Sequence, residues 1–542
     1  MFTQFETVDP EELCRRTEAE ILPQTVFGLL ARTVERHGDA IGLNFFDDGA
    51  ALSWREIARA ATRAANALRA AGIVKGSHVA VLLPNVIEYP IIWLGLARLG
   101  AVMAPINIGY TPRELRYIVE DSQAEFLVLH SELRASYDAL DPKPVPFSRA
   151  IVVGERLADF PLHWNALFAE AADSFRPAWP VEPDDVLNIQ YTSGTTGFPK
   201  GRMLSQRYWV TIGQACASVF GARMERVYGG FNFFYMIVQR MLMHAMIQGS
   251  ALYVPRKPAI RRVMADIRAH RLDNTSVFES SVYKHPPHPD DGKNALKLVN
   301  TFGLTKEYHE DFQRRFDVPA QEIYGMTEIG AALYMPIHEV AAKTGKGSCG
   351  VCAPFVRLMI ADEQGRPVKD GEAGELCVKG PAILHGYYNK NEANEAAFRD
   401  GWFRTGDQFR RDERGFHTIV GRFKDMVRRA GENIAAREVE AVLRALPEIQ
   451  DAAVLPVPDD YRGEEIKAYL LLMPGLTRAD FPPARVFAHC AGHLAPFKVP
   501  RYLEYRDALP RTESGRVRKK TLAAEKPDLR ADSFDRQDSV WR

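Results

Sequence analysis

A short loop rich in hydroxyl groups and glycine is the segment best suited to chemistry. Residues 191–201 read Tyr-Thr-Ser-Gly-Thr-Thr-Gly-Phe-Pro-Lys-Gly and follow an apolar stretch, 185–190. Gly194 and Gly197 free the backbone to curl, so that hydroxyl and N–H groups converge, and Lys200 adds a positive charge. The spacing is not that of the Walker phosphate loop. The composition predicts a loop that wraps a polyphosphate, and the alternative is a Ser/Thr/Gly turn without a ligand.

Three further segments follow this loop along the chain. Residues 324–328 read Tyr-Gly-Met-Thr-Glu, and residues 401–407 read Gly-Trp-Phe-Arg-Thr-Gly-Asp. Residues 421–431 read Gly-Arg-Phe-Lys-Asp-Met-Val-Arg-Arg-Ala-Gly and lead to Glu-Val-Glu at 438–440. In this order the four segments resemble the motifs of the adenylate-forming superfamily, which includes acyl-CoA synthetases, peptide-synthetase adenylation domains and luciferases. The resemblance covers about residues 25–522.

The resemblance implies a binding site for ATP, AMP or an acyl-adenylate. Tyr324 is expected to flank the adenine beside Gly325, and Thr327 to meet the phosphate. Asp407 is expected to bind both ribose hydroxyls, because a carboxylate accepts two hydrogen bonds in that fixed geometry, and Arg422 to reach the same ribose. Taken alone, Asp407 would be a turn residue and Arg422 a surface cation. The implied phosphate contacts in the loop are Thr192, Ser193, Gly194, Thr195, Thr196, Gly197 and Lys200.

The resemblance also implies a reaction in two halves. In the first, a carboxylate attacks the α-phosphorus of ATP, so two anions must be brought together. Mg²⁺ held by Glu328, with Lys200 and the hydroxyl of Thr192, would offset the charge on the leaving pyrophosphate. The implied catalytic residues are therefore Thr192, Lys200, Glu328 and the residue at position 516.

In the second half-reaction the thiol of coenzyme A attacks the carbonyl of the acyl-adenylate. Members of the superfamily reach this step by rotating a small C-terminal domain about a hinge, here at Lys424. The following loop is expected to line the pantetheine path, where Gly431 lets the backbone approach closely. Arg428 and Arg429 would meet the phosphates of coenzyme A, or they form an ordinary solvated face.

One motif departs from the family pattern at its last residue. The family usually has P-x-T-x-S-G-K, whose lysine bridges the carboxylate and the α-phosphate during adenylation, whereas residues 510–516 read Pro-Arg-Thr-Glu-Ser-Gly-Arg. Arg516 keeps the charge but replaces a compact ammonium with a wide planar fork. Misplacing a catalytic group by ~1 Å costs roughly a hundredfold in rate. We therefore expect weak or absent adenylation, intact thioester formation and a separate enzyme that supplies the adenylate.

Other departures lie at positions that the resemblance assigns to the nucleotide and acyl pockets. Arg202 and Gln206 stand where the family commonly has an apolar residue and a histidine. The glycine-rich stretch beside adenine reads Asn-Thr-Phe-Gly at 300–303, which leaves Gly303 as its one glycine. Residues 231–235, Phe-Asn-Phe-Phe-Tyr, hint at a sizeable apolar or aromatic acyl group, or they belong to the core. A specialised reaction and an unusual acid both explain these changes.

The elements that position the motifs predict an α/β fold. A capping box at 53–56 begins a helix, and a second helix runs from about Ile87 to Gly100, each followed by an apolar strand, 78–83 and 101–106. Short strands over 351–420, separated by Gly and Asp turns, predict a small antiparallel, β-barrel-like unit.

We expect a large N-terminal domain of α/β sheets at residues 1–421 and a small mobile α+β lid at 422–542, with the hinge near 424. The lid should contain a helix near 437–446 and a strand near 452–456. The polar residues from 523 onward are expected to fray.

Composition limits the partners. Lys plus Arg equals Asp plus Glu at 69 each, so no bulk field attracts nucleic acid or anionic lipid. Charged residues interrupt the two most apolar stretches, 78–106 and 231–255, which argues against a membrane span. The first six residues lack the pattern of a secretory signal, so the cytoplasm is expected. Cys349 and Cys352 form a lone C-x-x-C in an expected loop, where plain structural cysteines are favoured over a metal pair.

Together these observations predict an acyl-CoA ligase, an acid–thiol ligase that acts on a carboxylic acid or its acyl-adenylate with coenzyme A and Mg²⁺. The first alternative is a complete ATP-dependent ligase in which Arg516, Lys519 or Lys520 replaces the usual lysine. The second is a non-catalytic protein that binds an adenylate or coenzyme A. A peptide-synthetase adenylation domain is disfavoured because no carrier domain follows residue 542.

Overall fold

The computed structural model describes residues 5–192, 199–277, 286–302, 306–344, 347–422, 426–510, 517 and 519–542. Eight of the expected site residues lie outside these ranges: Ser193, Gly194, Thr195, Thr196, Gly197, Gly303, Lys424 and Arg516. The chain divides into two compact units. The first contains residues 1–108, 119–191 and 201–423, and the second contains residues 109–118, 192–200 and 424–542.

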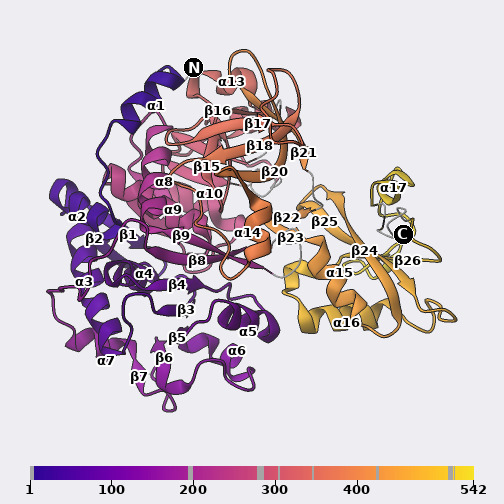
Figure 1. Cartoon of the computed structure of the whole chain (residues 1–542), viewed down its shortest axis with the longest axis horizontal. Helices are drawn as coiled ribbons and strands as arrows, with labels where there is room; N and C mark the ends of the chain where they lie inside the picture. Colours follow the sequence, from indigo (N-terminus) through magenta and orange to yellow (C-terminus); the bar gives the residue numbers. More distant parts are fainter. Residues whose placement is uncertain are drawn as a thin grey trace. The chain divides into compact units, whose positions relative to one another are not determined.

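The first unit contains a seven-stranded sheet in the order β7-β6-β5-β3-β4-β8-β9, with helices α4 (Glu88–Leu99) and α7 (Trp164–Glu170) packed against it (Figure 1). The neighbours from β7 to β8 pair in parallel. The strands are β3 (His78–Leu82), β4 (Val102–Pro105), β5 (Phe126–His130), β6 (Ala150–Val153), β7 (Leu162–His163), β8 (Val186–Thr192) and β9 (Lys200–Ser205). The capping box is present at the start of α3 (Trp54–Ala70), whose Ile57, Ala64 and Leu68 are buried. The predicted alternation of helices and parallel strands is confirmed.

A 14-stranded sheet forms the rest of the first unit. Its order is β17-β18-β20-β21-β16-β15-β14-β13-β12-β10-β11-β1-β2, with β19 paired to β20. The run from β14 to β1 is parallel, and the run from β14 to β17 is antiparallel, so the antiparallel strands continue the parallel ones. The strands are β1 (Ile41–Phe45), β2 (Ala50–Ser53), β10 (Arg226–Tyr228), β11 (Ala251–Val254), β12 (Asn274–Val277), β13 (Leu298–Thr301), β14 (Ala320–Met326), β15 (Gly330–Tyr334), β16 (Ser348–Cys352), β17 (Arg357–Ala361), β18 (Gly374–Lys379), β19 (Phe398–Arg399), β20 (Trp402–Arg411) and β21 (His417–Arg422).

Helices cover these sheets, and two of them lie deep in the core. On α8 (Gln206–Ser218), Trp209 packs edge-on against Trp93 with ring centroids 5.2 Å apart. On α9 (Met236–Gln248), nine residues are buried. The other helices are α1 (Pro10–Glu18), α2 (Val26–His37), α6 (Arg134–Asp138), α10 (Val263–His270), α12 (Lys306–Phe316), α13 (Val340–Lys343) and α14 (Asn391–Ala397). Most residues of α5 (Pro112–Asp121) belong to the second unit.

The expected loop around the C-x-x-C pair is wrong, because Cys349 and Cys352 lie in strand β16. Gly350 adopts φ +90° where the pairing register between β16 and β21 shifts, so the glycine serves a bulge within the strand. The Cys352 thiol lies 3.2 Å from the carbonyl oxygen of Val356. Within the part of the chain described here, no group of three or more His, Cys, Asp or Glu residues is placed to hold a metal ion.

The second unit has its own sheet and core. The sheet order is β23-β22-β25-β26-β27-β28, with β24 paired to β25. The core contains Val427, Ile434 and Val439. The strands are β22 (Met426–Arg429), β23 (Glu432–Ala435), β24 (Ile449–Asp459), β25 (Gly463–Leu472), β26 (Tyr502–Arg506), β27 (Phe534–Asp535) and β28 (Val540–Trp541), and the helices are α15 (Ala436–Arg444), α16 (Pro483–His493) and α17 (Lys519–Ala524).

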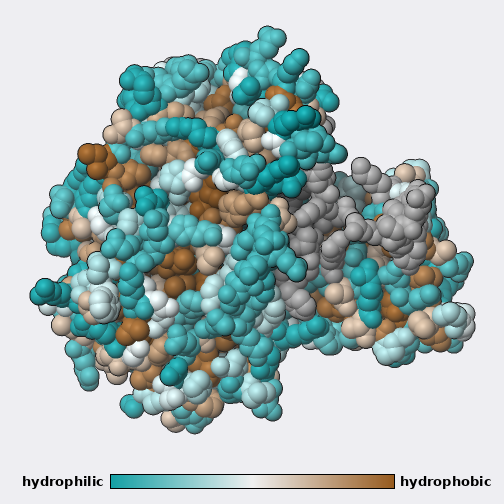
Figure 2. Space-filling model, in the orientation of Figure 1, coloured by the Kyte–Doolittle hydropathy of each residue, from teal (hydrophilic) through white to brown (hydrophobic). Residues whose placement is uncertain are grey.

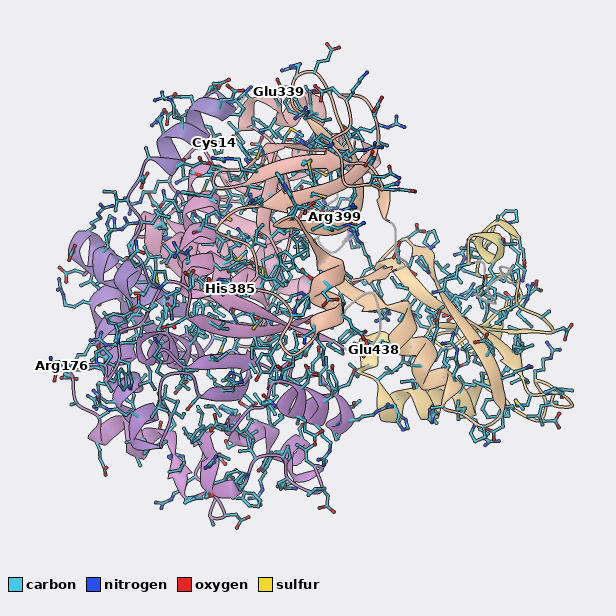
Figure 3. The ribbon with its side chains drawn as sticks, in the orientation of Figure 1. Cys14, Arg176, Glu339, His385, Arg399 and Glu438 are labelled. Atoms are coloured by element: carbon cyan, nitrogen blue, oxygen red, sulfur yellow. The ribbon has the colours of Figure 1, made fainter. Side chains whose placement is uncertain are left out.

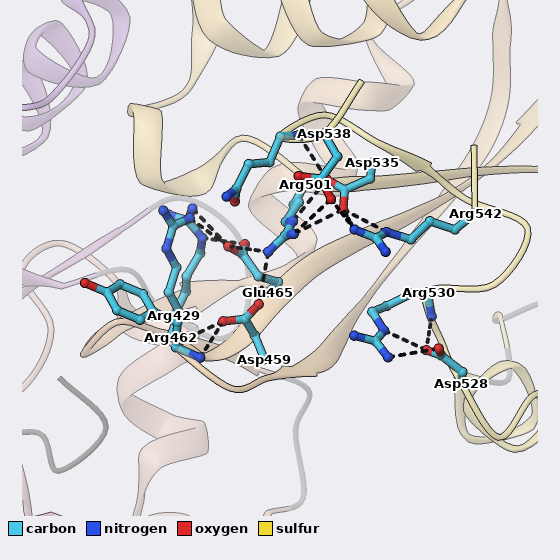
Figure 4. A network of polar contacts seen from close by, with 12 residues as sticks. Arg429, Asp459, Arg462, Glu465, Arg501, Asp528, Arg530, Asp535, Asp538 and Arg542 are labelled. Atoms are coloured by element: carbon cyan, nitrogen blue, oxygen red, sulfur yellow. Dashed lines mark hydrogen bonds and ion pairs between the residues drawn. The ribbon is translucent and has the colours of Figure 1, made fainter. Parts of the chain in front are cut away.

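The expected fraying from residue 523 onward is also wrong. Strands β27 and β28 continue the sheet from β26, and Asp535 is fully buried. Its carboxylate accepts hydrogen bonds from Arg501, at 3.1 Å, and from Nη2 of Arg542, at 2.6 Å (Figure 4). Ion pairs between polar side chains therefore hold this segment on the sheet, although its polar composition is typical of an exposed tail.

The surface shown in Figure 2 is mostly hydrophilic, with hydrophobic residues scattered between polar ones. None of the helices within the described ranges is long and apolar enough to cross a membrane.

Candidate active site

The motif at 324–328 forms a tight turn at the end of β14. Met326 pairs with Gly330 of β15, and the N–H of Ile329 donates to the carbonyl of Met326 at 3.0 Å. A Cβ at Gly325 would lie 2.1 Å from the carbonyl oxygen of Gly330, so only glycine fits there. The turn places Thr327 and Glu328 together, and Tyr208 of α8 holds it by donating to the carbonyl of Thr327 at 2.9 Å.

The aspartate expected to bind ribose meets the tyrosine expected to flank adenine. The hydroxyl of Tyr324 donates to Oδ2 of Asp407 at 2.7 Å, across 83 residues of sequence. Asp407 lies in β20 directly opposite Arg422 of β21, and it is only 4% exposed. The Tyr324 ring is fixed edge-on against Phe409, with ring centroids 4.8 Å apart. The structure thus brings together Tyr324, Asp407 and the backbone of Arg422.

Glu328 is bound by an arginine that the family pattern does not have. Nε of Arg202 lies 2.7 Å from Oε1 of Glu328, and these two side chains are 7% and 5% exposed. The hydroxyl of Tyr387 donates to the same oxygen at 3.1 Å. Burial and the nearby Glu328 carboxylate raise the pKa of Tyr387 well above its ordinary value, so the hydroxyl stays protonated and donates. We call these residues the Arg202–Glu328–Tyr387 cluster.

Backbone hydrogen bonds hold the cluster in place. The N–H of Leu384 donates to the carbonyl of Glu328 at 2.8 Å. Next to it, the N–H of His385, labelled in Figure 3, donates to the carbonyl of Met203 at 2.9 Å. Arg202 and Tyr387 form an antiparallel bridge. Strand β9, the turn at Glu328 and the segment at 384–387 are therefore fixed against one another.

The expected magnesium site at Glu328 does not fit this arrangement. Mg²⁺ prefers an octahedron of oxygen ligands at short distance. One Glu328 oxygen already forms an ion pair with a guanidinium and accepts a hydrogen bond from a phenol, and a divalent cation beside it would face the positive charge of Arg202. The sequence singled out Arg202 as a departure but gave no sign of Tyr387, whose role depends on pairing with β9.

The ends of the predicted phosphate loop lie on two strands that are neighbours in the sheet. Thr192 ends β8 and Lys200 begins β9. A Cβ at Gly201 would lie 2.4 Å from Cγ2 of Ile189, so β9 packs closely on β8 because Gly201 has no side chain. The loop residues between Thr192 and Lys200 that were expected to contact phosphate lie outside the described residues.

Two other departures from the family pattern have a structural explanation. Gln206 is fully buried, accepts from the N–H of Val26 at 3.0 Å and donates to the carbonyl of Ala97 at 3.1 Å. Asn300 is fully buried and donates to Gln321 at 3.1 Å. Both amides satisfy buried polar groups, as the interior requires.

The aromatic run at 231–235 belongs partly to the core. Phe233 is fully buried, and Asn85 fixes the backbone by accepting from its N–H at 2.8 Å and donating to the carbonyl of Phe231 at 3.0 Å. Downstream on α9, Arg240 is 6% exposed and donates to the hydroxyl of Ser276 at 3.1 Å. A buried guanidinium therefore lies near the carboxyl end of β12.

In the second unit the residues expected to meet coenzyme A separate into different environments. Gly431 adopts φ +87°, which glycine adopts without strain, and Arg428 is exposed. Arg429 is buried and pairs with Glu465, Nε to Oε2, at 2.6 Å, so it is not part of a solvated face. Lys519, one of the expected substitutes for the missing lysine, lies 2.8 Å from Glu440.

Buried acids also surround a lysine in this unit. Nζ of Lys498 donates to Glu438, labelled in Figure 3, at 2.8 Å and to Glu114 at 3.1 Å. Burial lowers the pKa of Lys498, but the neighbouring Tyr110, Glu438 and Glu114 outweigh burial and raise it, so the ammonium stays charged.

Family models match most of the chain. A model described as AMP-binding enzyme matches residues 30–388, and one described as AMP-binding enzyme C-terminal domain matches residues 438–516. The crotonobetaine/carnitine–CoA ligase of Proteus mirabilis is 32% identical over 492 residues, which covers 87% of this chain and 93% of that protein. The enzyme of the same name from Salmonella typhimurium is 32% identical over 486 residues, with the same coverage.

Solved structures share the fold. A double mutant of o-succinylbenzoate CoA synthetase from Bacillus subtilis matches with a TM-score of 0.79 and 24% identity, over 92% of this chain and 98% of that one. The amide bond synthetase of Marinactinospora thermotolerans matches with a TM-score of 0.81 and 22% identity, over 91% of this chain and 98% of that one.

Proposed function

Because this chain belongs to the family of AMP-binding enzymes, the adenylate-forming acyl-CoA synthetase superfamily, we propose that it makes an acyl-CoA thioester from an enzyme-bound acyl-adenylate. The observation that supports this most is the meeting of Tyr324 with Asp407, which brings two nucleotide motifs together. The names of the curated relatives, which are CoA ligases, support the same reaction.

The nucleotide half of the adenylate binds where Asp407 is fixed. The Tyr324 hydroxyl and the strand pairing with Arg422 hold the carboxylate in one orientation. A carboxylate held in this way accepts two charge-assisted hydrogen bonds from the ribose diol. Thr327, in the tight turn after Gly325, is the proposed phosphate contact.

Thioester formation follows by attack of the coenzyme A thiol on the acyl carbonyl. As the sulfur–carbon bond forms, the bond between the acyl carbon and the phosphate oxygen breaks, AMP leaves as its phosphate anion, and the thiol proton is released to solvent. Lys200 is the proposed cation for the phosphate of the leaving AMP. Gly431 is proposed to leave room for pantetheine, which its positive φ and lack of a side chain support.

The first half-reaction, adenylation by ATP, is proposed to be slow. Arg516 replaces the lysine that the family uses for that step, and Glu328 is engaged by Arg202. A separate adenylating enzyme would then supply the acyl-adenylate. The complete ATP-dependent ligase is the rival proposal, and the names of the relatives favour it.

The acid is proposed to lack a fixed positive charge. Crotonobetaine and carnitine, named for the relatives, carry a quaternary ammonium group. Here the helix that follows the proposed acyl segment, 231–235, buries the guanidinium of Arg240. Like charges in a buried site repel each other strongly, so this region disfavours a cationic acyl group.

The two half-reactions, assayed separately, test this proposal. ATP–pyrophosphate exchange with a panel of acids measures adenylation, and acyl-CoA formation from presynthesised adenylates measures thioester formation. We expect thioester formation with little exchange. Brisk exchange and thioester formation with the same acid would establish the complete ligase instead, and no thioester from any adenylate would refute both versions.

A further inference from the structure

The Arg202–Glu328–Tyr387 cluster contains a buried ion pair, Arg202 with Glu328, at the motif of residues 324–328. All three residues are in the first unit and at most 7% exposed. Arg202 and Glu328 are separated by 126 residues of sequence, and backbone bonds from Leu384 and His385 fix the segments that hold them. A charge pair buried this deeply persists only when each charge has a partner, so the arginine and the glutamate depend on each other.

Arg202 also lies on the same strand as the lysine that ends the phosphate loop. Lys200 and Arg202 both belong to β9, and alternate residues of a strand lie on the same face. Arg202 is therefore expected on the same face of β9 as Lys200, and its guanidinium supplies a cation beside Glu328. An adenylate phosphate near the motif would meet positive charge supplied by the chain.

Building on the proposed function, we infer that Arg202 replaces a divalent metal ion at Glu328, so that this protein binds its adenylate without Mg²⁺. The carboxylate that the family pattern assigns to the metal is neutralised by the guanidinium at 2.7 Å and accepts a hydrogen bond from the Tyr387 hydroxyl at 3.1 Å. Removing the guanidinium leaves a buried carboxylate without a cation, and a metal ion can then take its place.

The inference predicts that AMP binding, which does not need a metal ion in the wild-type protein, becomes dependent on Mg²⁺ in a single variant. Arg202→Met keeps a long unbranched side chain but removes the charge. Wild-type protein should bind AMP with an affinity that differs by less than about twofold between EDTA and MgCl₂. Without the guanidinium, AMP should bind about tenfold or more weakly in EDTA and recover in MgCl₂, since truncating one partner of a buried ion pair leaves the other charge uncompensated.

Two measurements on the full chain test this. Isothermal titration calorimetry with AMP gives the affinities, and electron paramagnetic resonance with Mn²⁺ and AMP reports bound metal directly. We expect only free Mn²⁺ with the wild-type protein and bound Mn²⁺ with Arg202→Met. The matched control is Arg207→Met, which removes an arginine exposed on α8 and paired with the exposed Asp184. It should behave as wild type in both measurements.

Two further variants keep the inference testable if Arg202→Met does not fold. If Arg202→Met does not fold, the double variant Arg202→Met/Glu328→Gln removes both charges, and it should bind AMP weakly with or without metal. Arg202→Lys keeps a cation and should stay insensitive to Mg²⁺. Wild-type AMP affinity that rises about tenfold with Mg²⁺, or Mn²⁺ bound by the wild-type–AMP complex, would overturn the inference alone. Absence of AMP binding under every condition would refute the proposed function together with the inference.

Discussion

Each unit of the molecule buries an arginine–glutamate ion pair, and the two pairs differ in geometry and surroundings. In the second unit, the guanidinium of Arg429 donates hydrogen bonds to both carboxylate oxygens of Glu465, at 2.6 and 3.3 Å. Arg462 donates a third hydrogen bond to this carboxylate at 2.7 Å (Figure 4). In the first unit, the contact of Arg202 with Glu328 is from Nε to one carboxylate oxygen. The Arg429–Glu465 pair joins strands β22 and β25, whereas the Arg202–Glu328 pair neutralises a carboxylate in the turn after β14.

The largest expected effect comes from breaking the pair in the second unit. Arg429→Met leaves Glu465 buried without its bidentate partner and should lower the free energy of unfolding by about 3–5 kcal/mol. Urea unfolding checks this, with Arg485→Met as the control, because Arg485 pairs on the surface with Glu448 and should cost less than about 1 kcal/mol. Equal losses for the two variants would contradict the structural role of the Arg429–Glu465 pair.

Asp407, the carboxylate that we propose binds ribose, should affect AMP affinity when it is replaced, whereas the Arg429–Glu465 pair should affect the stability of the fold. Asp407→Ala should weaken AMP binding by about 2–4 kcal/mol, because two charge-assisted hydrogen bonds to ribose are lost. Tyr324→Phe, which removes only the hydroxyl that orients Asp407, should cost about 1 kcal/mol. Calorimetric titration of folded variants measures both. Unchanged affinity in Asp407→Ala would remove this residue from the site.

The ion network of the second unit should also give stability that depends on pH. Burial raises the pKa of Asp535, but hydrogen bonds from Arg501 and Arg542 outweigh it and lower the pKa to about 2. The folded pKa is below the unfolded one, so the stabilisation is present above about pH 4 and is lost as pH falls toward 2. Asp535→Asn should cost about 2 kcal/mol at neutral pH, and its deficit should shrink in acid. A deficit that stays constant from pH 6 to pH 3 would contradict this.

The smallest expected effect concerns Arg516. Arg516→Ala should change the rate of thioester formation by less than about twofold, because this side chain is assigned to adenylation alone. Arg516→Lys should raise pyrophosphate exchange, and combining it with Arg202→Met should raise exchange further if both arginines limit the first half-reaction. A tenfold loss of thioester formation in Arg516→Ala would show that the two half-reactions share this residue.

Local patterns predicted the fold well where caps and apolar periodicity agree. The capping box at Ser53 and Glu56 correctly predicted the start of α3, and the apolar runs correctly predicted β3 and β4. The full order of the 14-stranded sheet was not predictable, because two of its pairings, β1 with β11 and β16 with β21, join strands that are distant in sequence. Polar composition misled at the C-terminus, where buried ion pairs order the chain.

The motifs identified the family, and that prediction is confirmed, as is the acyl-CoA synthetase type of enzyme. The contact between Tyr324 and Asp407 agrees with two motifs meeting at one site, but the individual residue roles, the domain limits at 421 and 422 and the cytoplasmic location stay predictions. The sequence marked Arg202 as unusual without revealing its partner. That partner follows only from the pairing of β9 with the turn at Glu328 and the segment around Tyr387.

Thioester formation from a supplied adenylate tests the proposed function most directly. Presynthesised adenylates of short aliphatic, longer aliphatic and aromatic acids would be mixed with wild-type protein and coenzyme A, and the acyl-CoA and AMP produced would be measured by mass spectrometry. We predict equimolar acyl-CoA and AMP at a rate on the order of 1 s⁻¹ or more for at least one adenylate, and a large loss of that rate in Asp407→Ala. Release of AMP without acyl-CoA, or no turnover of any adenylate, would contradict the assignment.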